Sequence, residues 1–251
     1  MSVVNILGYS VSNAGLQKDA KVAMDFVVNN QKSKYMACAN PHSLVEAVSD
    51  SAFKQALHKA DILLPDGAGI LLAAKILNLD VKERVAGTEF FIELTRLCNE
   101  KGQVNVFFLG STEQVLEGLV KQVNKTFPNV NICGTYSPPF KAEFSDEDNQ
   151  AMADAINTAD THVLWVGMTA PKQEKWIYQL KDKLDVNFIG AIGAVFDFYS
   201  GSKKRAPEWI CNLGLEWLPR LLREPGRLWK RNFVSSPLFL WAVFKQKFSL
   251  S

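Results

Sequence analysis

Cysteine and histidine are scarce in this sequence and are scattered along it. The 251 residues include four cysteines and three histidines. No cysteine lies within four residues of another, which excludes the close pairs typical of zinc knuckles and redox motifs. The histidines show no metal-ligand spacing either, so we predict no metal site and no cofactor. Isolated cysteines in a chain of this length indicate reduced core residues of a cytosolic protein. They are Cys38, Cys98, Cys133 and Cys211.

Long apolar segments are also lacking. A spanning helix needs about 20 apolar residues, whereas the candidate FVSSPLFLWAVF at 233–244 is shorter and contains Pro237. The N-terminal MSVVNILGYSVSN has no basic start and no long apolar stretch, so we expect no signal peptide. The sequence predicts a soluble or peripheral protein.

Charge of one sign is not in excess overall, but it is unevenly distributed. The chain has 28 Lys and Arg against 26 Asp and Glu. Residues 203–247 carry ten of the basic residues and three glutamates, a net charge of about +7 in a chain whose total is +2. This basic tail predicts an anionic partner. No nucleic-acid recognition motif accompanies the charge, so we do not expect nucleic acid to be that partner.

Short β-rich apolar runs alternate with amphipathic stretches up to about residue 200, which predicts an α/β fold. We expect a mainly parallel sheet with helices on both faces. The predicted strands are Val3–Leu7, Tyr35–Ala39, Asp61–Leu64, Val104–Leu109, Val130–Gly134, His162–Val166 and Asn187–Ile192. The predicted helices are Gly15–Asn30, Ser43–Lys59, Ala68–Leu77, Thr88–Lys101, Glu113–Thr126, Asp146–Thr158 and Pro171–Leu184. Residues 1–200 would form this core, and 201–251 a helical appendage with no strand candidate.

In such a sheet ligands bind beyond the carboxyl ends of the strands, and one aspartate follows a predicted strand directly. Asp66 sits in the turn LPDGAG before the next helix, where Gly67 allows a ligand to approach closely. Asp-Gly is equally a favoured turn pair, and Asp a good N-cap. The local residues leave a structural and a functional interpretation open.

Two further strand-to-helix turns have features that suit phosphate. Gly110 and Ser111 precede a predicted helix whose N-terminus would present N–H groups to a phosphate. The alternative is that Ser111 or Thr112 is a plain N-cap, with Glu113 in the first turn. In the turn from Gly167, Pro171 fits the first helical position, which places Lys172, Gln173 and Glu174 in the first turn. A lysine at a positive helix end makes better sense beside an anion.

Two other candidates stand in loops. Arg84 lies in KERVAG, which could be only a solvated loop. Asp197 lies among aromatic residues after the last strand, and a buried carboxylate there needs a partner.

The tail combines basic and aromatic residues at helical spacing. Arg220, Arg223, Arg227 and Lys230 (or Arg231) recur at steps of three and four. Such a face suits an anionic membrane interface. The alternatives are a helix pair docked on the core with a solvated basic face, or packing against a second copy of the chain.

Together these stretches resemble the WecG/TagA/CpsF family of bacterial glycosyltransferases. The matching segments follow the order of the family and cover nearly the whole chain: ANPHSL (39–44), LPDGAGILLAAKIL (64–77), RVAGTEFF (84–91), FFLGS (107–111), GTYSPPF (134–140), APKQEKWI (170–177), IGAIGAVFDFYSG (189–201), and KRAPEW with GLEWLPRLLREPGRLWKR in the tail.

The resemblance implies a Rossmann-like core with a C-terminal appendage. It also implies inverting, metal-independent transfer from a UDP-sugar to a sugar on undecaprenyl diphosphate, at the inner face of the cell membrane. It implies Asp66 as catalytic base, with Arg84 and Gln173 in the active site and Asp197 at the uracil. Further substrate contacts would come from Asn40, Gly67, Gly110, Ser111, Gly134, Tyr136, Gly167, Lys172 and Glu174. Arg220, Arg223, Arg227, Lys230 and Arg231 would meet the acceptor diphosphate and an anionic membrane surface.

The chain departs from the family before Asn40, where Cys38 or Ala39 replaces an expected threonine, and a difference in sugar recognition is expected if that hydroxyl contacts the sugar in relatives. N-acetylmannosamine or its uronic acid is the expected donor sugar, in cell-surface polysaccharide biosynthesis. Alternatives are a UDP-glucose-type hexosyltransferase, or a non-catalytic regulator that binds nucleotide sugars at the membrane. An oxidoreductase is disfavoured because the glycine-rich dinucleotide fingerprint is absent.

Overall fold

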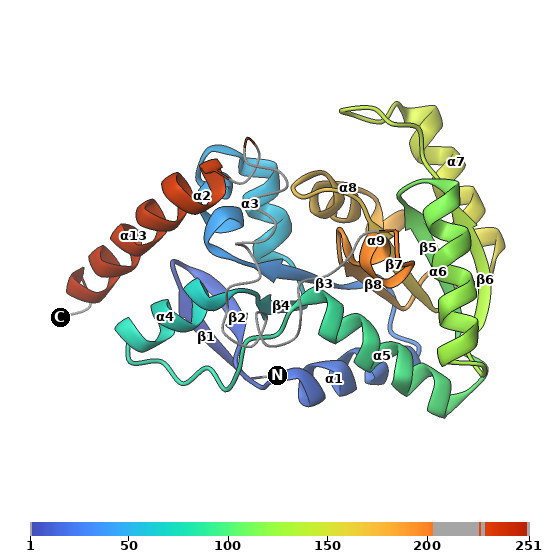
Figure 1. The fold of residues 1–251 in the computed structure, drawn as a ribbon, viewed down its shortest axis with the longest axis horizontal. Coiled ribbons are helices and arrows are strands. Elements are labelled where there is room, and N and C mark those ends of the chain that lie inside the picture. The colour runs from blue at the N-terminus through green and yellow to red at the C-terminus, as the bar shows by residue number, and fades with distance from the viewer. Residues whose placement is uncertain (1, 203–225, 227–228, 250–251) are drawn as a thin grey trace.

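A six-stranded parallel sheet forms the centre of the protein (Figure 1). The computed structural model describes residues 2–202, 226 and 229–249. The strand order is β4-β3-β8-β7-β5-β6, and every neighbouring pair is parallel. The strands are β3 (Lys34–Ala39), β4 (Ile62–Pro65), β5 (Asn105–Gly110), β6 (Asn131–Tyr136), β7 (Val163–Gly167) and β8 (Phe188–Ala191). The predicted α/β class is confirmed, and each of these strands overlaps a predicted one.

Helices cover both faces of the sheet. Successive strand residues point to opposite sides, so each strand contributes side chains to a buried cluster on either face. On β5, Val106 and Phe108 belong to one buried cluster, and Phe107 and Leu109 to the other. Strands that are buried on both faces therefore read as continuous apolar runs. The first cluster includes α1 (Leu16–Val28), α5 (Gly87–Lys101), α6 (Glu113–Thr126) and α9 (Val195–Tyr199), and the second includes α7 (Asp146–Thr158) and α8 (Lys172–Leu180). A short 3-10 helix, η1 (Lys181–Lys183), follows α8.

The first predicted strand lies outside this sheet. Residues Val3–Ile6 form β1, which pairs antiparallel with β2 (Tyr9–Ser12) in a separate two-stranded sheet. The sequence analysis missed β2 and so missed the hairpin. Leu7 and Gly8 connect the strands with positive φ angles of 52° and 86°. Two such residues make the turn type that matches the twist of a hairpin.

The predicted helix Ser43–Lys59 is two helices, α2 (Pro41–Ser49) and α3 (Ser51–His58). Asp50 ends the first and caps the second, because its side chain accepts a hydrogen bond from the Phe53 N–H at 2.9 Å. A third buried cluster joins these helices, the hairpin, α4 (Ala68–Ile76) and the last helix.

The last helix, α13 (Ser236–Ser249), follows a π-helix, η2 (Lys230–Ser235), and packs on the core with buried Phe239 and Val243. Gln246 also binds the hairpin, since its Oε1 accepts from the Leu7 N–H at 2.7 Å. This part of the tail is therefore docked on the core. None of the helices that the structure describes is both long and apolar enough to cross a membrane. The domain division at residue 200 stays a prediction.

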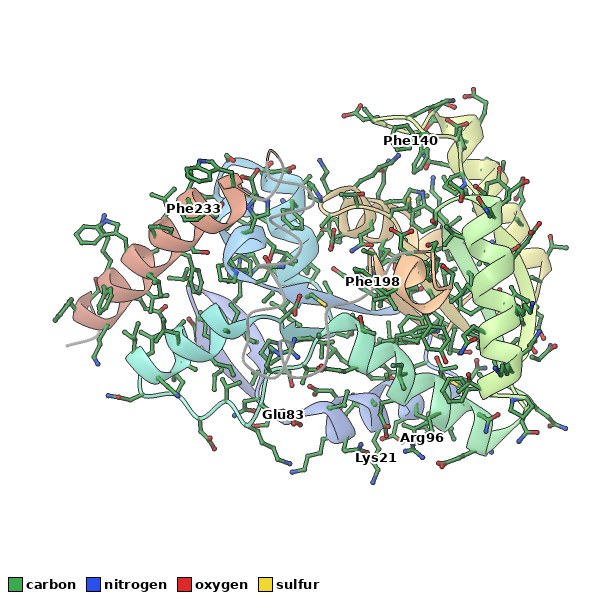
Figure 2. The ribbon with its side chains drawn as sticks, in the orientation of Figure 1. Lys21, Glu83, Arg96, Phe140, Phe198 and Phe233 are labelled. Carbon is green, nitrogen blue, oxygen red and sulfur yellow. The ribbon has the colours of Figure 1, made fainter. Side chains whose placement is uncertain are left out.

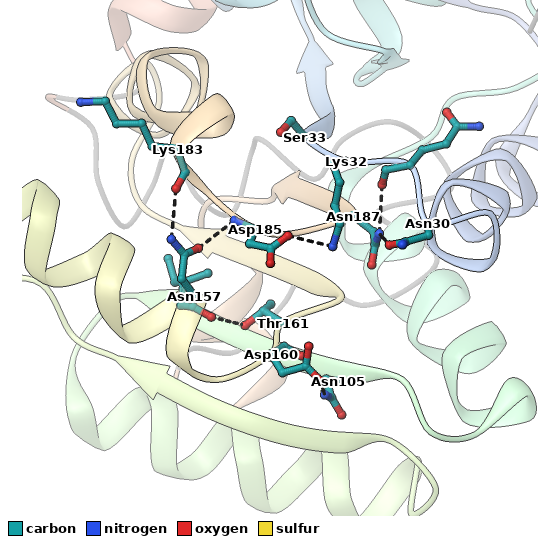
Figure 3. Close-up of polar contacts among 12 residues, drawn as sticks. Asn30, Lys32, Ser33, Asn105, Asn157, Asp160, Thr161, Lys183, Asp185 and Asn187 are labelled. Atoms are coloured by element: carbon teal, nitrogen blue, oxygen red, sulfur yellow. Dashed lines mark hydrogen bonds and ion pairs between the residues drawn. The ribbon is translucent and has the colours of Figure 1, made fainter.

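Polar side chains bind one another at the amino-terminal edge of the sheet (Figure 3). Asn187 donates to Asn30 Oδ1 at 2.9 Å, and Asn157 Oδ1 accepts from the Asp185 N–H at 2.7 Å. Asp185 also forms an ion pair with Lys32 at 2.9 Å. These groups satisfy each other, so this edge has a structural role, and the opposite edge is the place to look for a ligand site.

Candidate active site

The carboxyl ends of all six parallel strands meet at one edge of the sheet. β5 and β7 are neighbours in this sheet, and the strands that follow them in the chain, β6 and β8, lie on opposite sides of the pair. In open α/β sheets, ligands bind at such a change in the direction of the strand order. Most of the predicted site residues lie at this edge. Asn40 follows β3, Asp66 follows β4 and Ser111 follows β5, while Tyr136 and Gly167 end β6 and β7.

Asp66 and Arg84 flank a backbone hydrogen bond that joins the end of β4 to the loop before α5. The Val85 N–H donates to the Pro65 carbonyl at 3.0 Å. Asp66 follows Pro65 and Arg84 precedes Val85, so the two residues belong to adjacent stretches of backbone. The turn is open beside Asp66 among the described residues, since none of their atoms beyond the adjoining backbone lies within 4 Å of the place where a Cβ on Gly67 would stand. Asp66 and Arg84 are therefore carried by neighbouring segments at the carboxyl edge of the sheet.

Arg84 is held in place by an ion pair. Its Nη2 lies 2.8 Å from Glu89 Oε1, and the Arg84 side chain is 19% exposed. The other oxygen of Glu89 accepts from the Ala86 N–H at 3.0 Å, at the start of α5. The sequence analysis did not identify Glu89. A glutamate three residues after a helix start was the available signal.

Asn40 lies beside the Asp66 turn and caps α2. The Asp66 N–H donates to the Ala39 carbonyl at 2.9 Å, which brings the two turns together. Asn40 Oδ1 accepts from the Ser43 N–H at 3.0 Å, and the Asn40 N–H donates to Ser43 Oγ at 2.9 Å. The side-chain oxygen of this predicted substrate residue is therefore engaged in the cap.

Cys38 is a site residue that the sequence analysis noted only as a departure from the family. A Cβ on Gly87 would stand 3.6 Å from the Sγ of Cys38. Burial raises the pKa of the Cys38 thiol, and the negative charge of nearby Asp66 raises it further. The thiol is therefore neutral. Its place near the end of β3, next to Asn40, was the signal for this position.

Gln173 and Glu174 are buried in the first turn of α8. Gln173 is 4% exposed and Glu174 is 3% exposed. Gln173 Oε1 accepts from the Gly193 N–H at 2.9 Å, and Gln173 Nε2 donates to Glu174 Oε1 at 2.9 Å. The amide thus links α8 to the turn that follows β8. Pro171, expected at the first helical position, is the N-cap of α8 and follows a cis peptide bond.

Ser111 and Asp197 come from distant segments and meet at the same edge. Ser111 Oγ donates to Asp197 Oδ1 at 3.5 Å. Asp197 lies on α9, between buried Phe196 and partly buried Phe198, which Figure 2 labels. Of the two caps that the sequence allowed for α6, Thr112 is the one observed, with its Oγ1 accepting from the Val115 N–H at 3.4 Å.

Lys172 contacts the loop between β6 and α7. Its Nζ donates to the Lys141 carbonyl and lies 3.6 Å from the centroid of the Phe144 ring. Both partners are uncharged, and burial lowers the pKa of the ammonium group. Phe140, labelled in Figure 2, is fully exposed in the same loop. Lys172 thus carries a positive charge at the base of a loop on the carboxyl edge.

Three predicted glycine contacts have packing reasons of their own. A Cβ on Gly110 would stand 2.6 Å from the Gly167 carbonyl oxygen. One on Gly167 would stand 2.3 Å from the Phe196 ring, and one on Gly134 would stand 2.5 Å from the Phe107 ring. These positions require glycine whether or not a ligand touches them.

The side chains of the predicted basic site residues in the tail lie outside the described part of the structure. Arg220, Arg223 and Arg227 are not among the described residues, and the side chains of Lys230 and Arg231 are not described.

Within the described ranges, no three His, Cys, Asp or Glu side chains gather closely enough to hold a metal ion. A lysine-rich surface hollow does occur at the amino-terminal edge, far from these strand ends. Its Lys34 and Lys181 pair with Asp61 and Asp182.

The chain is similar to known proteins over most of its length. Residues 4–251 match the model of the family described as "Glycosyl transferase WecG/TagA/CpsF family". A protein of Bacillus subtilis (strain 168) named N-acetylglucosaminyldiphosphoundecaprenol N-acetyl-beta-D-mannosaminyltransferase is 31% identical over 212 residues, covering 84% of this chain and 79% of the relative. A Bacillus spizizenii protein of the same name is 30% identical over 220 residues, covering 88% and 82%. One from Staphylococcus aureus (strain MW2) is 26% identical over 247 residues, covering 97% and 93%.

Proposed function

Because the chain belongs to the WecG/TagA/CpsF family and is thus a glycosyltransferase, we propose that it moves N-acetylmannosamine from a UDP-sugar to a lipid-linked acceptor. The acceptor would be N-acetylglucosamine on undecaprenyl diphosphate, as the names of the relatives describe for those proteins. The observation that supports this chemistry best is the placement of Asp66 beside Arg84 at an open turn of the carboxyl edge. The product would serve cell-surface polysaccharide biosynthesis.

Asp66 acts as the general base. It takes the proton of the acceptor hydroxyl as that oxygen forms a bond to the anomeric carbon of the donor sugar. The bond between the anomeric carbon and the UDP oxygen breaks at the same time, and its electron pair leaves with UDP. A single displacement of this kind inverts the anomeric centre.

Charge that develops on the leaving diphosphate needs fixed donors. Arg84 supplies a guanidinium that Glu89 holds in one orientation. Lys172 supplies an ammonium group at the start of α8, a helix whose N-terminus has no side-chain cap. In this proposal these cations replace a metal ion, and Asp197 with Ser111 receives the uracil end of the donor.

A membrane-anchored acceptor calls for an enzyme that reaches the membrane surface. We propose that the outer face of α13 makes this contact at the inner face of the cell membrane. Leu238, Trp241 and Phe248 are 51%, 62% and 74% exposed and recur at helical spacing. Lys245 Nζ lies 5.4 Å from the Trp241 ring centroid. Exposed aromatic residues beside cations are typical of helices that lie in an anionic interface.

A donor panel tests the proposed reaction. The full-length protein is incubated with a synthetic polyprenyl-diphosphate N-acetylglucosamine and the UDP derivatives of N-acetylmannosamine, its uronic acid and glucose, with and without EDTA. We expect kcat/KM for the N-acetylmannosamine donor to be at least about tenfold above the others, and EDTA to leave it unchanged. A preference for UDP-glucose would contradict the proposed donor, and loss of activity in EDTA would contradict the metal-independent mechanism.

A further inference from the structure

Glu174 is buried at the active edge with only one of its oxygens engaged. Its side chain is 3% exposed, and Oε1 accepts from Gln173 Nε2 at 2.9 Å. Oε2 is fully buried and has no hydrogen-bond partner in the described part of the chain. A buried polar atom without a partner is rare, and an unpartnered carboxylate charge costs far more than a neutral carboxyl group.

The one bond that Glu174 makes sets the orientation of Gln173. The amide has a carbonyl side and an amino side, and the Gly193 N–H can only donate, so it needs the carbonyl side. Glu174 Oε1 accepts from the amino side and thereby stabilises this orientation. A flipped amide would place two donors against each other at Gly193.

The Gly193 turn in turn determines where α9 begins. Gly193 has a φ of 56°, and a Cβ on it would stand 3.5 Å from the Met168 carbonyl oxygen. The turn is therefore packed between the ends of β7 and β8. Asp197 follows four residues later, on α9, with Ser111 Oγ at 3.5 Å. Glu174, Gln173 and Gly193 thus form a chain of contacts from α8 to the place where we put the donor nucleotide.

We propose that Glu174 is a positioning residue that works as a neutral carboxylic acid, holding Gln173 in the orientation that fixes the Gly193 turn and the donor site. This inference rests on the proposed transferase reaction. Ionisation of Glu174 would leave a carboxylate charge in a buried site with Oε2 unpartnered. Movement of the side chain that relieves this cost would release the Gly193 turn.

The surroundings contain no cation that contacts this carboxyl group among the described residues. Burial raises the pKa of Glu174 to about 7. From β3, Tyr35 and Cys38 face it, and burial raises the pKa of both, so both stay neutral near that pH. β8 carries no titratable side chain, and Lys175 on the same helix is paired with Asp50 at 2.9 Å. The other titratable groups on α8 are Lys172 and Tyr178. Those on elements packed near α8 are Lys54 and His58 on α3, Lys181, Asp182 and Lys183 on η1, and Asp146, Glu147, Asp148 and Asp154 on α7.

The pH dependence of transfer tests this role. Wild-type protein, Glu174→Gln and Glu174→Ala are assayed from pH 6.5 to 9 with donor and acceptor varied separately. For the wild type we expect kcat/KM for the donor to fall above about pH 7, approaching tenfold per unit. Glu174→Gln keeps a neutral acceptor for Gln173, so it should retain more than about a third of the activity at pH 6.5 and lose the alkaline decline. Glu174→Ala should raise KM for the donor about tenfold at every pH.

Control measurements separate this proposal from the proposed reaction. Glu117→Gln, an exposed change on α6, should keep the wild-type profile. The role of Glu174 is overturned if Glu174→Gln keeps the wild-type alkaline decline, or if it is as impaired as Glu174→Ala while both melt normally at pH 6.5. Absence of transfer by the wild type with every donor would instead contradict the proposed function. In that case the dissociation constant for UDP, measured as a function of pH, would report on the Gly193 turn.

Discussion

Arg84 and Glu89 form a 2.8 Å ion pair in which the carboxylate also binds the Ala86 N–H, so one side chain orients the cation and starts α5. The two side chains are 19% and 31% exposed, and partly exposed pairs of this kind contribute little to stability. The pair therefore matters for where the guanidinium points. In the proposed reaction, the pair would hold Arg84 ready for the charge of the leaving diphosphate before substrate arrives.

Loss of this pair should impair transfer more than folding. Glu89→Gln keeps an oxygen for the Ala86 N–H and removes the charge that holds Arg84. We expect kcat to fall about tenfold or more, with a free energy of unfolding within about 1 kcal/mol of the wild type. Glu100→Gln on the same helix is the matched control, since it breaks the ion pair of Glu100 with Arg96 away from the site. Equal effects of the two substitutions on kcat would contradict the role given to Glu89.

Asp66→Asn should separate binding from chemistry. The amide keeps the size of the side chain but cannot take a proton, so kcat should fall by about 100-fold to 10,000-fold. The dissociation constant for UDP, measured by calorimetry, should stay within about twofold because the phosphate contacts are unchanged. Asp25→Asn, an exposed change on α1, serves as control. Transfer at the wild-type rate by Asp66→Asn would exclude Asp66 as the base.

Gly167→Ala should disturb both stability and the donor site. The new Cβ would stand 2.3 Å from the ring of Phe196, which precedes Asp197 on α9. We expect a loss of about 1–3 kcal/mol of unfolding free energy, measured in urea, because the ring must move in a packed core. KM for the donor should also rise, because movement of the Phe196 ring would displace the adjacent Asp197. Gly87→Ala places a Cβ at an ordinary 3.6 Å from Cys38 Sγ and should change stability by less than about 1 kcal/mol.

The buried carboxyl of Glu174 should also make stability depend on pH. Its pKa is raised from 4.5 to about 7 in the folded protein, so the folded state holds this proton more tightly than the unfolded chain. The contribution is fully present below about pH 4.5 and is lost as pH rises through about 7, with a total of about 3 kcal/mol at most. Denaturation of Glu174→Gln between pH 5 and 8 should show a correspondingly smaller decline than the wild type. If the unfolding free energy changed with pH by the same amount in both proteins, the pKa of Glu174 in the folded state would be near its ordinary value.

Apolar residues on the outer face of α13 should govern membrane binding. Trp241→Ser with Phe248→Ser should reduce sedimentation with vesicles containing phosphatidylglycerol by about tenfold, and neutral vesicles should bind weakly in all cases. Val48→Ser, at an 83% exposed apolar position on α2, is the control. Unchanged vesicle binding together with a shift from dimer to monomer would show that this face meets a second copy of the chain instead.

Local sequence determined the helices and strands of the sheet and the turns that hold the candidate residues. Strand and helix periodicity depend on neighbours two to four positions away, and Asp66 follows β4 because a proline and a glycine end the strand there. The same locality explains the errors. The hairpin of β1 and β2 depends on Leu7 accepting a positive φ, and the break at Asp50 depends on a cap that two helices share.

Tertiary structure alone decided which turns face one another. The order β4-β3-β8-β7-β5-β6 brings Ser111 to Asp197 and Gln173 to Gly193 across 86 and 20 residues. It also buries Glu174 and brings the loop that carries Arg84 next to the turn that carries Asp66. Parallel strands obtain their partners through long connections, and no local pattern specifies which strand lies next to which. The sequence therefore determined the parts of the site, and the packing of distant segments determined their contacts, because burial and hydrogen bonding are satisfied only in the complete sheet.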